Sequence, residues 1–255
     1  MGAGHAHALY VHEHSPVHRL APEAKVAAGF AFVLAVALTP REAVWAFAVD
    51  AVALAAVVRL ARLPVPFVLA RLAIIAPFLA FAFLIPFIGS GERVDMLGVS
   101  VSRAGLWGTW NIVAKASLGA TTSIVLAATT EVPQILRGMA RLRVPPTLTI
   151  IAAFMVRYLE LIVGELRRMR TAMVARGYDP RWLWQAQPIA ASAGALFIRS
   201  YERGERVHTA MAARGFTGTM PDVDVSTATG RQWAAAAPLP LLAATLAMVA
   251  WLVGA

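Results

Sequence analysis

Five apolar stretches determine what kind of protein this sequence can fold into. They cover residues 24–38, 43–60, 67–88, 104–128 and 233–253. Their lengths lie near the roughly 20 residues that a helix needs to cross the apolar core of a bilayer. Because lipid offers backbone groups no hydrogen-bond partners, such stretches must form helices. The sequence therefore predicts an all-α, polytopic membrane protein with five transmembrane helices, four of them within residues 24–128 and the fifth within 233–255.

Composition supports a membrane protein. Charged residues make up only 15% of the chain, against about 25% in a soluble domain. The formal charge of +9 does not indicate nucleic-acid binding, because 14 of the 23 Lys and Arg residues, all of them Arg, lie in the single segment 129–233. Basic segments between spans mark the cytoplasmic side. The chain has no Cys, which excludes disulfides and thiolate metal sites.

The charge distribution also predicts a topology. With the arginine-rich segment in the cytoplasm, the N-terminus and the loop 61–66 are cytoplasmic, whereas the charge-balanced loop 89–103 lies outside. We therefore expect a multi-pass protein of the inner (plasma) membrane.

The N-terminal tail, residues 1–23, is rich in histidine. Its imidazoles are His5, His7, His12, His14 and His18. Histidines at this density can hold a divalent metal ion, but the sequence shows no fixed geometry for one. An unstructured tail without a metal site is the favoured interpretation, and whether the tail binds metal stays open.

Three charged residues fall inside predicted spans: Asp50, Arg71 and Lys115. Charges inside spans are candidates for a functional role by default, as is the neighbouring polar residue Asn111. We expect interhelical ion pairs or side chains that reach the membrane interface, because no two of them form a recognisable relay.

Residues 129–216 have a different pattern. Thr129–Pro133 reads as a helix start with a Thr cap, and two longer amphipathic helices are expected over about 147–176 and 188–214. Arg157 and Glu160 in the first of these favour a helix at the membrane interface over a span. A polar linker, 217–232, leads to the last span.

One sequence occurs twice in this segment. Residues 171–178 and 209–216 are identical except for Val174 against Ala212 and Tyr178 against Phe216. Each copy closes a charged helix with Ala-Arg-Gly, namely Ala175, Arg176 and Gly177, and Ala213, Arg214 and Gly215. A Gly after the last turn stops a helix in the left-handed conformation, so simple helix punctuation is one interpretation.

The preceding Thr-Ala-Met-x-Ala-Arg favours a second interpretation, two equivalent docking points for a pair of similar partners. An Arg guanidinium always carries its charge and binds carboxylates with two hydrogen bonds, and the flanking Ala and Gly let a partner surface come close. The sequence has no phosphate-binding Gly-x-x-x-x-Gly-Lys-Ser/Thr loop and no nucleophile–base set. We expect no catalytic residues, no cofactor and no enzymatic activity.

Two Ala-Arg-Gly signatures on the cytoplasmic helices of a five-span protein resemble the transmembrane T component of energy-coupling factor (ECF) transporters. Residues 196–207 are similar to the cobalt branch of that family, CbiQ, and residues 18–25 are similar to its usual N-terminal segment. In residues 18–25 the chain differs from the family pattern at two positions. The family has an acid in place of Ala21 and a base in place of Glu23.

The resemblance implies a coupling scaffold without catalysis of its own. Arg176 and Arg214, each with its Ala and Gly, would dock into two ABC-type ATPases that hydrolyse the ATP. The apolar faces of the cytoplasmic helices would hold a separate substrate-binding membrane subunit, the S component, within the lipid bilayer. Cobalt would be the substrate and would be bound by that subunit.

The sequence leaves several alternatives open. The substrate can instead be nickel or a vitamin, and the two ATPases can be identical or different. A different class of function is an autonomous metal-ion permease that uses the His-rich tail together with Asp50, Asn111 or Lys115. A membrane enzyme is disfavoured because the chain lacks a catalytic constellation.

Overall fold

The computed structural model describes residues 10–11, 13–88, 93–96, 99–180, 182–218 and 227–254. The chain divides into two compact units. Among the described residues, unit 1 lies within Arg143–Val225, and unit 2 comprises the parts within Leu9–Leu142 and Ser226–Ala255. Part of the linker expected over 217–232 and the histidines His5, His7 and His12 lie outside the described residues.

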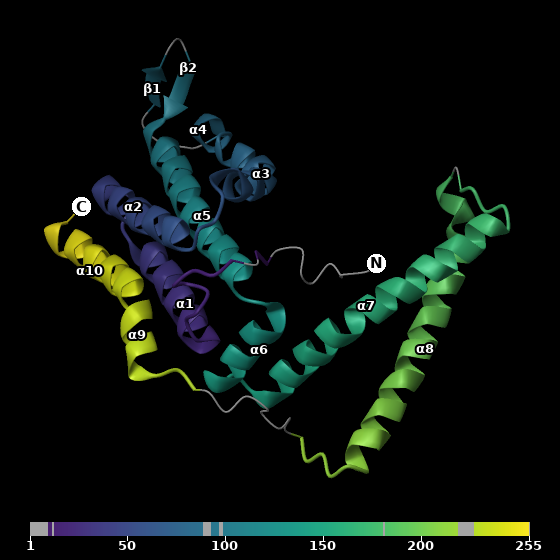
Figure 1. The fold of residues 1–255 in the computed structure, drawn as a ribbon. Coiled ribbons are helices and arrows are strands. Elements are labelled where there is room, and N and C mark those ends of the chain that lie inside the picture. The colour runs from purple at the N-terminus through teal and green to yellow at the C-terminus, as the bar shows by residue number, and fades with distance from the viewer. Residues whose placement is uncertain are drawn as a thin grey trace. The chain divides into compact units, whose positions relative to one another are not determined.

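Unit 2 is built mainly from helices (Figure 1). They are α1 (Pro22–Leu38), α2 (Val44–Leu60), α3 (Val65–Ala82), α4 (Ile85–Ile88), α5 (Arg103–Thr129), α6 (Val132–Arg141), α9 (Gly230–Ala236) and α10 (Pro238–Val253). Two short antiparallel strands, β1 (Arg93–Met96) and β2 (Val99–Ser102), stand between α4 and α5. This hairpin is absent from the sequence prediction, which has a loop there.

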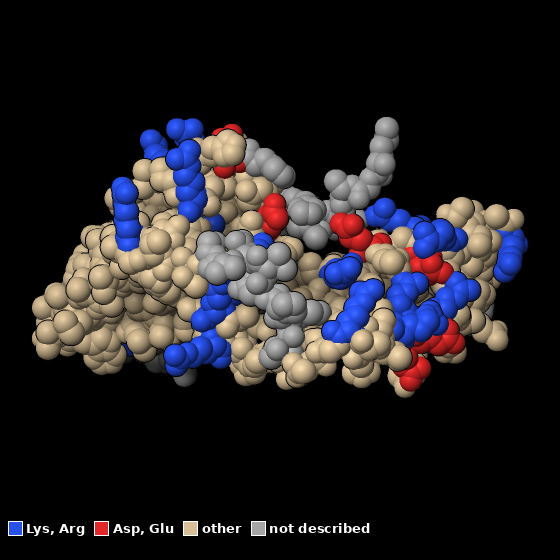
Figure 2. Space-filling view, turned by 60° about the horizontal axis from the view of Figure 1, so that its bottom comes forward, with Lys and Arg blue, Asp and Glu red and all other residues tan. Residues whose placement is uncertain are grey.

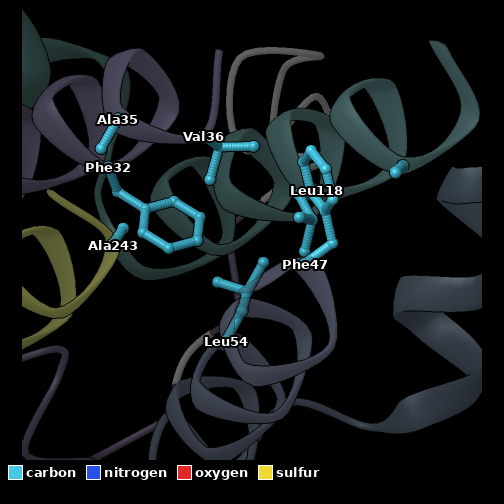
Figure 3. Close-up of a cluster of buried hydrophobic side chains, with 8 residues drawn as sticks. Phe32, Ala35, Val36, Phe47, Leu54, Leu118 and Ala243 are labelled. Atoms are coloured by element: carbon cyan, nitrogen blue, oxygen red, sulfur yellow. The ribbon is translucent and has the colours of Figure 1, made fainter. Parts of the chain in front are cut away.

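Helix α1 is central to unit 2, because it packs against α5, α6 and α10. Figure 3 shows the apolar cluster that joins it to its neighbours. Its labelled members are Phe32, Ala35 and Val36 from α1, Phe47 and Leu54 from α2, Leu118 from α5 and Ala243 from α10. Small residues at these contacts let helices approach closely, which is how helices pack in lipid.

Three threonines of α5 form hydrogen bonds within the helix itself. Thr121, Thr122 and Thr129 donate their hydroxyl protons to carbonyls four residues earlier, at 2.7–2.8 Å. Such bonds allow a helix with many Ser and Thr residues to lie in an apolar environment. The hydroxyl of Thr129 is therefore engaged inside α5. It does not cap α6, although the sequence pattern predicted a Thr cap at this helix start. Glu131 is the N-cap residue of α6, and its side chain makes no capping bond.

Three helical segments are long and apolar enough to cross a membrane: Val65–Ile88, Arg103–Thr129 and Pro146–Ala175. The pair α9 and α10 adds a fourth if it counts as one span bent by 46°. Helices α1 and α2 occupy the first two predicted stretches, but each has only 17 residues. The described structure thus supports a membrane protein with three to four candidate spans. Five spans stay a prediction.

The outer surface of α3 is apolar. Ile74, Phe78 and Phe81 leave 70–75% of their surface exposed. Soluble proteins rarely expose contiguous apolar patches of this kind. Contact with lipid explains why these apolar side chains are exposed, since lipid tails are as apolar as the side chains.

Unit 1 consists of α7 (Pro146–Ala175), a short 3₁₀ helix (Leu183–Ala186) and α8 (Gln187–Ala212). The two long helices agree with the predicted ranges to within two residues. They run antiparallel, with Met173 against Ser192 and Glu165 against Arg199. They meet near the 3₁₀ helix and diverge toward the other end (Figure 1). The interfacial position expected for α7 stays a prediction, because α7 also has the length and composition of a span.

Candidate functional site

The first Ala-Arg-Gly signature forms a closed helix end. Gly177 has φ +79°, in the left-handed region, and its N–H donates to the carbonyl of Val174 at 2.9 Å. The N–H of Tyr178 donates back to the carbonyl of Met173 at 3.1 Å. These two bonds define the Schellman motif, which satisfies carbonyls that a helix end would otherwise leave without partners.

The second signature repeats this geometry at the end of α8. Gly215 also has φ +79°, and its N–H donates to the carbonyl of Ala212 at 3.0 Å. The N–H of Phe216 donates to the carbonyl of Met211 at 3.0 Å. The sequence repeat is thus a repeat of three-dimensional structure.

The helix stop accounts for only part of each signature. The Schellman motif requires the Gly, and it is commonly accompanied by an apolar contact between the residue after it and the third residue from the helix end. In agreement, Tyr178 and Phe216 are half-buried, as are Met173 and Met211. The Ala and Arg of both signatures are exposed. Among the described residues, Arg176 and Arg214 form no side-chain hydrogen bond or ion pair, so both guanidinium groups are available to a partner.

The two glycines provide a test of this geometry. Gly177→Ala and Gly215→Ala force a Cβ into the left-handed region, which costs about 1–2 kcal/mol per site. We expect faster hydrogen exchange at the amides of Tyr178 and Phe216, whose bonds depend on that turn. Asn tolerates this conformation, so Gly177→Asn should restore protection. Gly194→Ala, in an exposed and open position of α8, is the control and should not disturb either end. Unchanged exchange in the two Ala variants would contradict the assignment.

The charges of unit 1 are interspersed. Glu165 of α7 accepts hydrogen bonds from Arg168 at 2.6 Å and from Arg199 of α8 at 2.5 Å, and Arg206 lies 3.8 Å from Glu202. Figure 2 shows basic and acidic residues side by side over the α7–α8 unit, whereas much of the visible surface of unit 2 is uncharged. Glu165 therefore joins the two helices through its bond to Arg199.

An apolar groove opens where α7 and α8 diverge. It encloses about 420 Å³ between Phe154, Tyr158 and Ile162 of α7 and Val207 and Met211 of α8. Phe216, the aromatic residue of the second signature, also lines it. The second signature therefore contributes a side chain to the wall of the groove.

Comparison with known proteins identifies the family. The family model described as "Cobalt transport protein", CbiQ, matches residues 13–225, which is most of the chain. The chain belongs to the CbiQ family. This match includes both signatures and all of unit 1 that the structure describes.

Individual relatives of this chain support the same family assignment. A cobalt transport protein CbiQ of Rhodobacter capsulatus is 36% identical over 113 residues, which cover 43% of this chain and 45% of that protein. The energy-coupling factor transporter transmembrane protein EcfT of Bacillus selenitireducens is 26% identical over 230 residues, covering 82% of both chains. The EcfT protein of Bacillus subtilis is 26% identical over 227 residues, covering 82% of this chain and 83% of that protein.

The structure does not bring the charged residues of the spans together. Lys115 donates to the carbonyl of Ala37 at 2.7 Å, and the Arg71 guanidinium lies 3.4 Å from the centre of the Phe67 ring. Asp50 is fully buried, and both of its carboxylate oxygens lack a hydrogen-bond partner in the described part of the chain. Of the two arrangements expected for these charges, an ion pair or a side chain at the interface, Asp50 shows no ion pair among the described residues.

Asp50→Leu tests whether this carboxyl group destabilises the folded protein. A buried polar group without a partner costs about 1–3 kcal/mol, whereas Leu suits the apolar surroundings of Phe47 and Leu54. We expect Asp50→Leu to raise the free energy of unfolding in lipid nanodiscs by about 1 kcal/mol. Asp50→Asn keeps the polar group and serves as the control, with a smaller change. If Asp50→Leu is instead destabilised, the carboxyl group has a partner that the isolated chain lacks.

The described histidines do not form a metal site. His18 has both ring nitrogens engaged, Nδ1 with the Ser15 hydroxyl at 2.7 Å and Nε2 with the carbonyl of Val11 at 3.1 Å. Burial lowers the pKa of the His18 imidazole, which favours its neutral form. His14 is exposed, and His208 lines the groove of unit 1. No group of three or more potential metal ligands occurs among the residues that the structure describes.

A buried contact between the N-terminus of α1 and helix α6 becomes visible only in the structure. Glu23 is buried and pairs with Arg141 of α6, and Gly138 of α6 lies directly against the backbone of Pro22 and Glu23. The sequence marked Glu23 only as a departure from the family pattern. A Gly within an amphipathic helix, three residues before the Arg at its end, was the available signal for this contact.

Proposed function

We propose that this chain is the transmembrane coupling component of an ECF-type ABC importer for cobalt ions. It links two ABC-type ATPases, which hydrolyse ATP, to a substrate-binding membrane subunit. In this proposal the N-terminus, α7 and α8 are cytoplasmic, and the chain itself has no catalytic site.

The repeated helix end is the observation that carries the proposal. Two ends with the same hydrogen bonds each present an exposed Ala-Arg-Gly, at Ala175–Gly177 and at Ala213–Gly215. A pair of equal docking elements suits a pair of similar ATPases. Membership of the CbiQ family and the match to EcfT over 82% of the chain support the same role.

The apolar surface of unit 1 supports a second partner within the membrane. Leu148, Ile151 and Met155 on the N-terminal half of α7 leave 51–67% of their surface exposed. We propose that the substrate-binding subunit covers these side chains. The description of the matching family supports cobalt as the cargo. The name of the EcfT relatives states no substrate, so nickel and vitamins stay alternatives.

Reconstitution tests the proposal. The chain is co-expressed with the ATPases and the candidate substrate-binding subunit of the same genome, purified in detergent and placed in liposomes. We expect the ATPases to co-purify and cobalt uptake to require ATP. Uptake by the chain alone, lost on deletion of residues 1–18, would instead establish an autonomous permease that uses the His-rich tail.

A further inference from the structure

A single buried carboxylate in unit 2 holds two other segments of the chain. Glu23, near the start of α1, leaves only 4% of its surface exposed. Its two carboxylate oxygens lie 3.4 and 3.5 Å from Nη1 of Arg141, and Oε1 also accepts the backbone N–H of Ala228 at 2.6 Å. Buried charges are stable only when paired and hydrogen-bonded, and here the donors come from α6 and from the segment before α9.

Among the described residues, these two segments are where the chain passes from unit 2 to unit 1 and back. Arg141 is the last residue of α6, and unit 1 begins at Arg143. Unit 1 ends at Val225, and Ala228 follows three residues later. The chain therefore leaves unit 2 and returns to it at positions that are both bound to Glu23.

The contact of α6 with α1 is also close at the backbone level. A Cβ added to Gly138 would lie 2.9 Å from the backbone N of Glu23 and from the carbonyl carbon of Pro22. Backbone atoms of two helices in such contact cannot slide past each other without losing the fit. Gly138 thereby fixes the distance at which Arg141 reaches Glu23.

We propose that Glu23 is a positioning residue that anchors both connections of unit 1 to α1. The inference rests on the proposed function: when ATPases displace unit 1, its two connections transmit the displacement to α1 only while Glu23 holds them. Without this carboxylate, ATP hydrolysis continues and transport is lost.

The first test uses the isolated chain in detergent and hydrogen exchange of backbone amides. Glu23→Ala removes both contacts, and we expect the Ala228 amide and the C-terminal amides of α6 to exchange about tenfold faster, as for loss of one charge-assisted hydrogen bond. Glu23→Gln keeps a carbonyl oxygen for Ala228 but loses the charge that attracts Arg141. It should therefore accelerate exchange only at the end of α6, and it decides the test if Glu23→Ala does not fold.

Glu42→Ala is the matched control. It also removes a carboxylate next to α1, but the Glu42 side chain is exposed and pairs with the adjacent Arg41, at 2.7 Å. Its exchange pattern should equal that of the wild type at both connections. Wild-type exchange in Glu23→Ala, or in Glu23→Gln at the end of α6, would overturn the anchor.

The second test uses the assembled transporter and compares ions transported with ATP hydrolysed. We expect Glu23→Ala to retain bound ATPases and their hydrolysis rate and to lose uptake, with partial rescue in Glu23→Gln. Uptake and hydrolysis that fall in proportion, or unchanged uptake, would overturn the positioning role. If the wild-type chain binds no ATPase, the proposed function fails, and the exchange experiment still decides whether Glu23 holds the two connections.

Discussion

Arg176→Glu combined with Arg214→Glu is expected to abolish co-purification of the ATPases with this chain. Both side chains are exposed, and neither bonds to another side chain within the described residues. Their replacement therefore removes no contact that the isolated chain is known to need. At a docked interface, by contrast, each reversal places a carboxylate where the partner surface binds a cation.

The expected loss of affinity for the ATPases is large for a pair of single-residue changes. Removing one partner of a buried charge pair at an interface costs about 2–5 kcal/mol. This cost corresponds to a loss of affinity of roughly 30-fold to several thousand-fold at each site. The single variants should each retain one docked ATPase, because the two helix ends are separate elements.

The control is Arg170→Glu, an equal charge reversal at an exposed position of α7 outside the signature. It should co-purify ATPases as the wild type does. Measurement of the thermal midpoint of all variants separates loss of docking from loss of folding. Equal ATPase recovery with the wild type and the double variant would show that the repeat serves only to end two helices.

Gly138→Ala is expected to destabilise unit 2 by about 2–3 kcal/mol. The new Cβ would meet three backbone atoms of Pro22 and Glu23 at 2.9–3.2 Å, and two of these distances are shorter than Cβ contacts in folded proteins. Backbone atoms within a helix cannot yield as a flexible side chain can. The helix α6 must therefore move away from α1, which also lengthens the contact between Arg141 and Glu23.

Gly119→Ala in α5 is the matched control, because its Cβ would lie 4.0 Å from the nearest atom, a methyl group of Val33. There the substitution should be neutral or stabilising by about 0.5–1 kcal/mol, the gain of Ala over Gly inside a helix. Denaturant titration in detergent measures the free energy of unfolding of both variants. A Gly138→Ala protein as stable as the wild type would contradict the close contact of α1 and α6.

The helices of this chain could be predicted closely from its sequence. The stretches expected over 43–60 and 104–128 are α2 and α5, and the two amphipathic helices end as the Gly177 and Gly215 signals indicate. Helix periodicity and helix stops depend on residues within about five positions of one another, so a local pattern contains the information.

Other features could not be predicted from the sequence pattern. The last predicted span is divided into α9 and α10 at Pro238, and the loop before α5 contains a hairpin of two four-residue strands. Strands this short produce almost no periodic signal. The cap of α6 was assigned to Thr, but Thr129 bonds within α5, because an intrahelical carbonyl is available to it at 2.8 Å.

The sequence by itself determined the helical membrane architecture, the segregation of arginine and the two equal helix ends, because each depends on composition or on short-range spacing. Only the tertiary structure decided which buried charges have partners. Glu23 meets Arg141 across 118 residues and Ala228 across 205, whereas Asp50 meets no hydrogen-bond partner among the described residues. Whether a buried carboxylate is paired depends on which helices pack together, and that is decided by the burial of many apolar side chains at once.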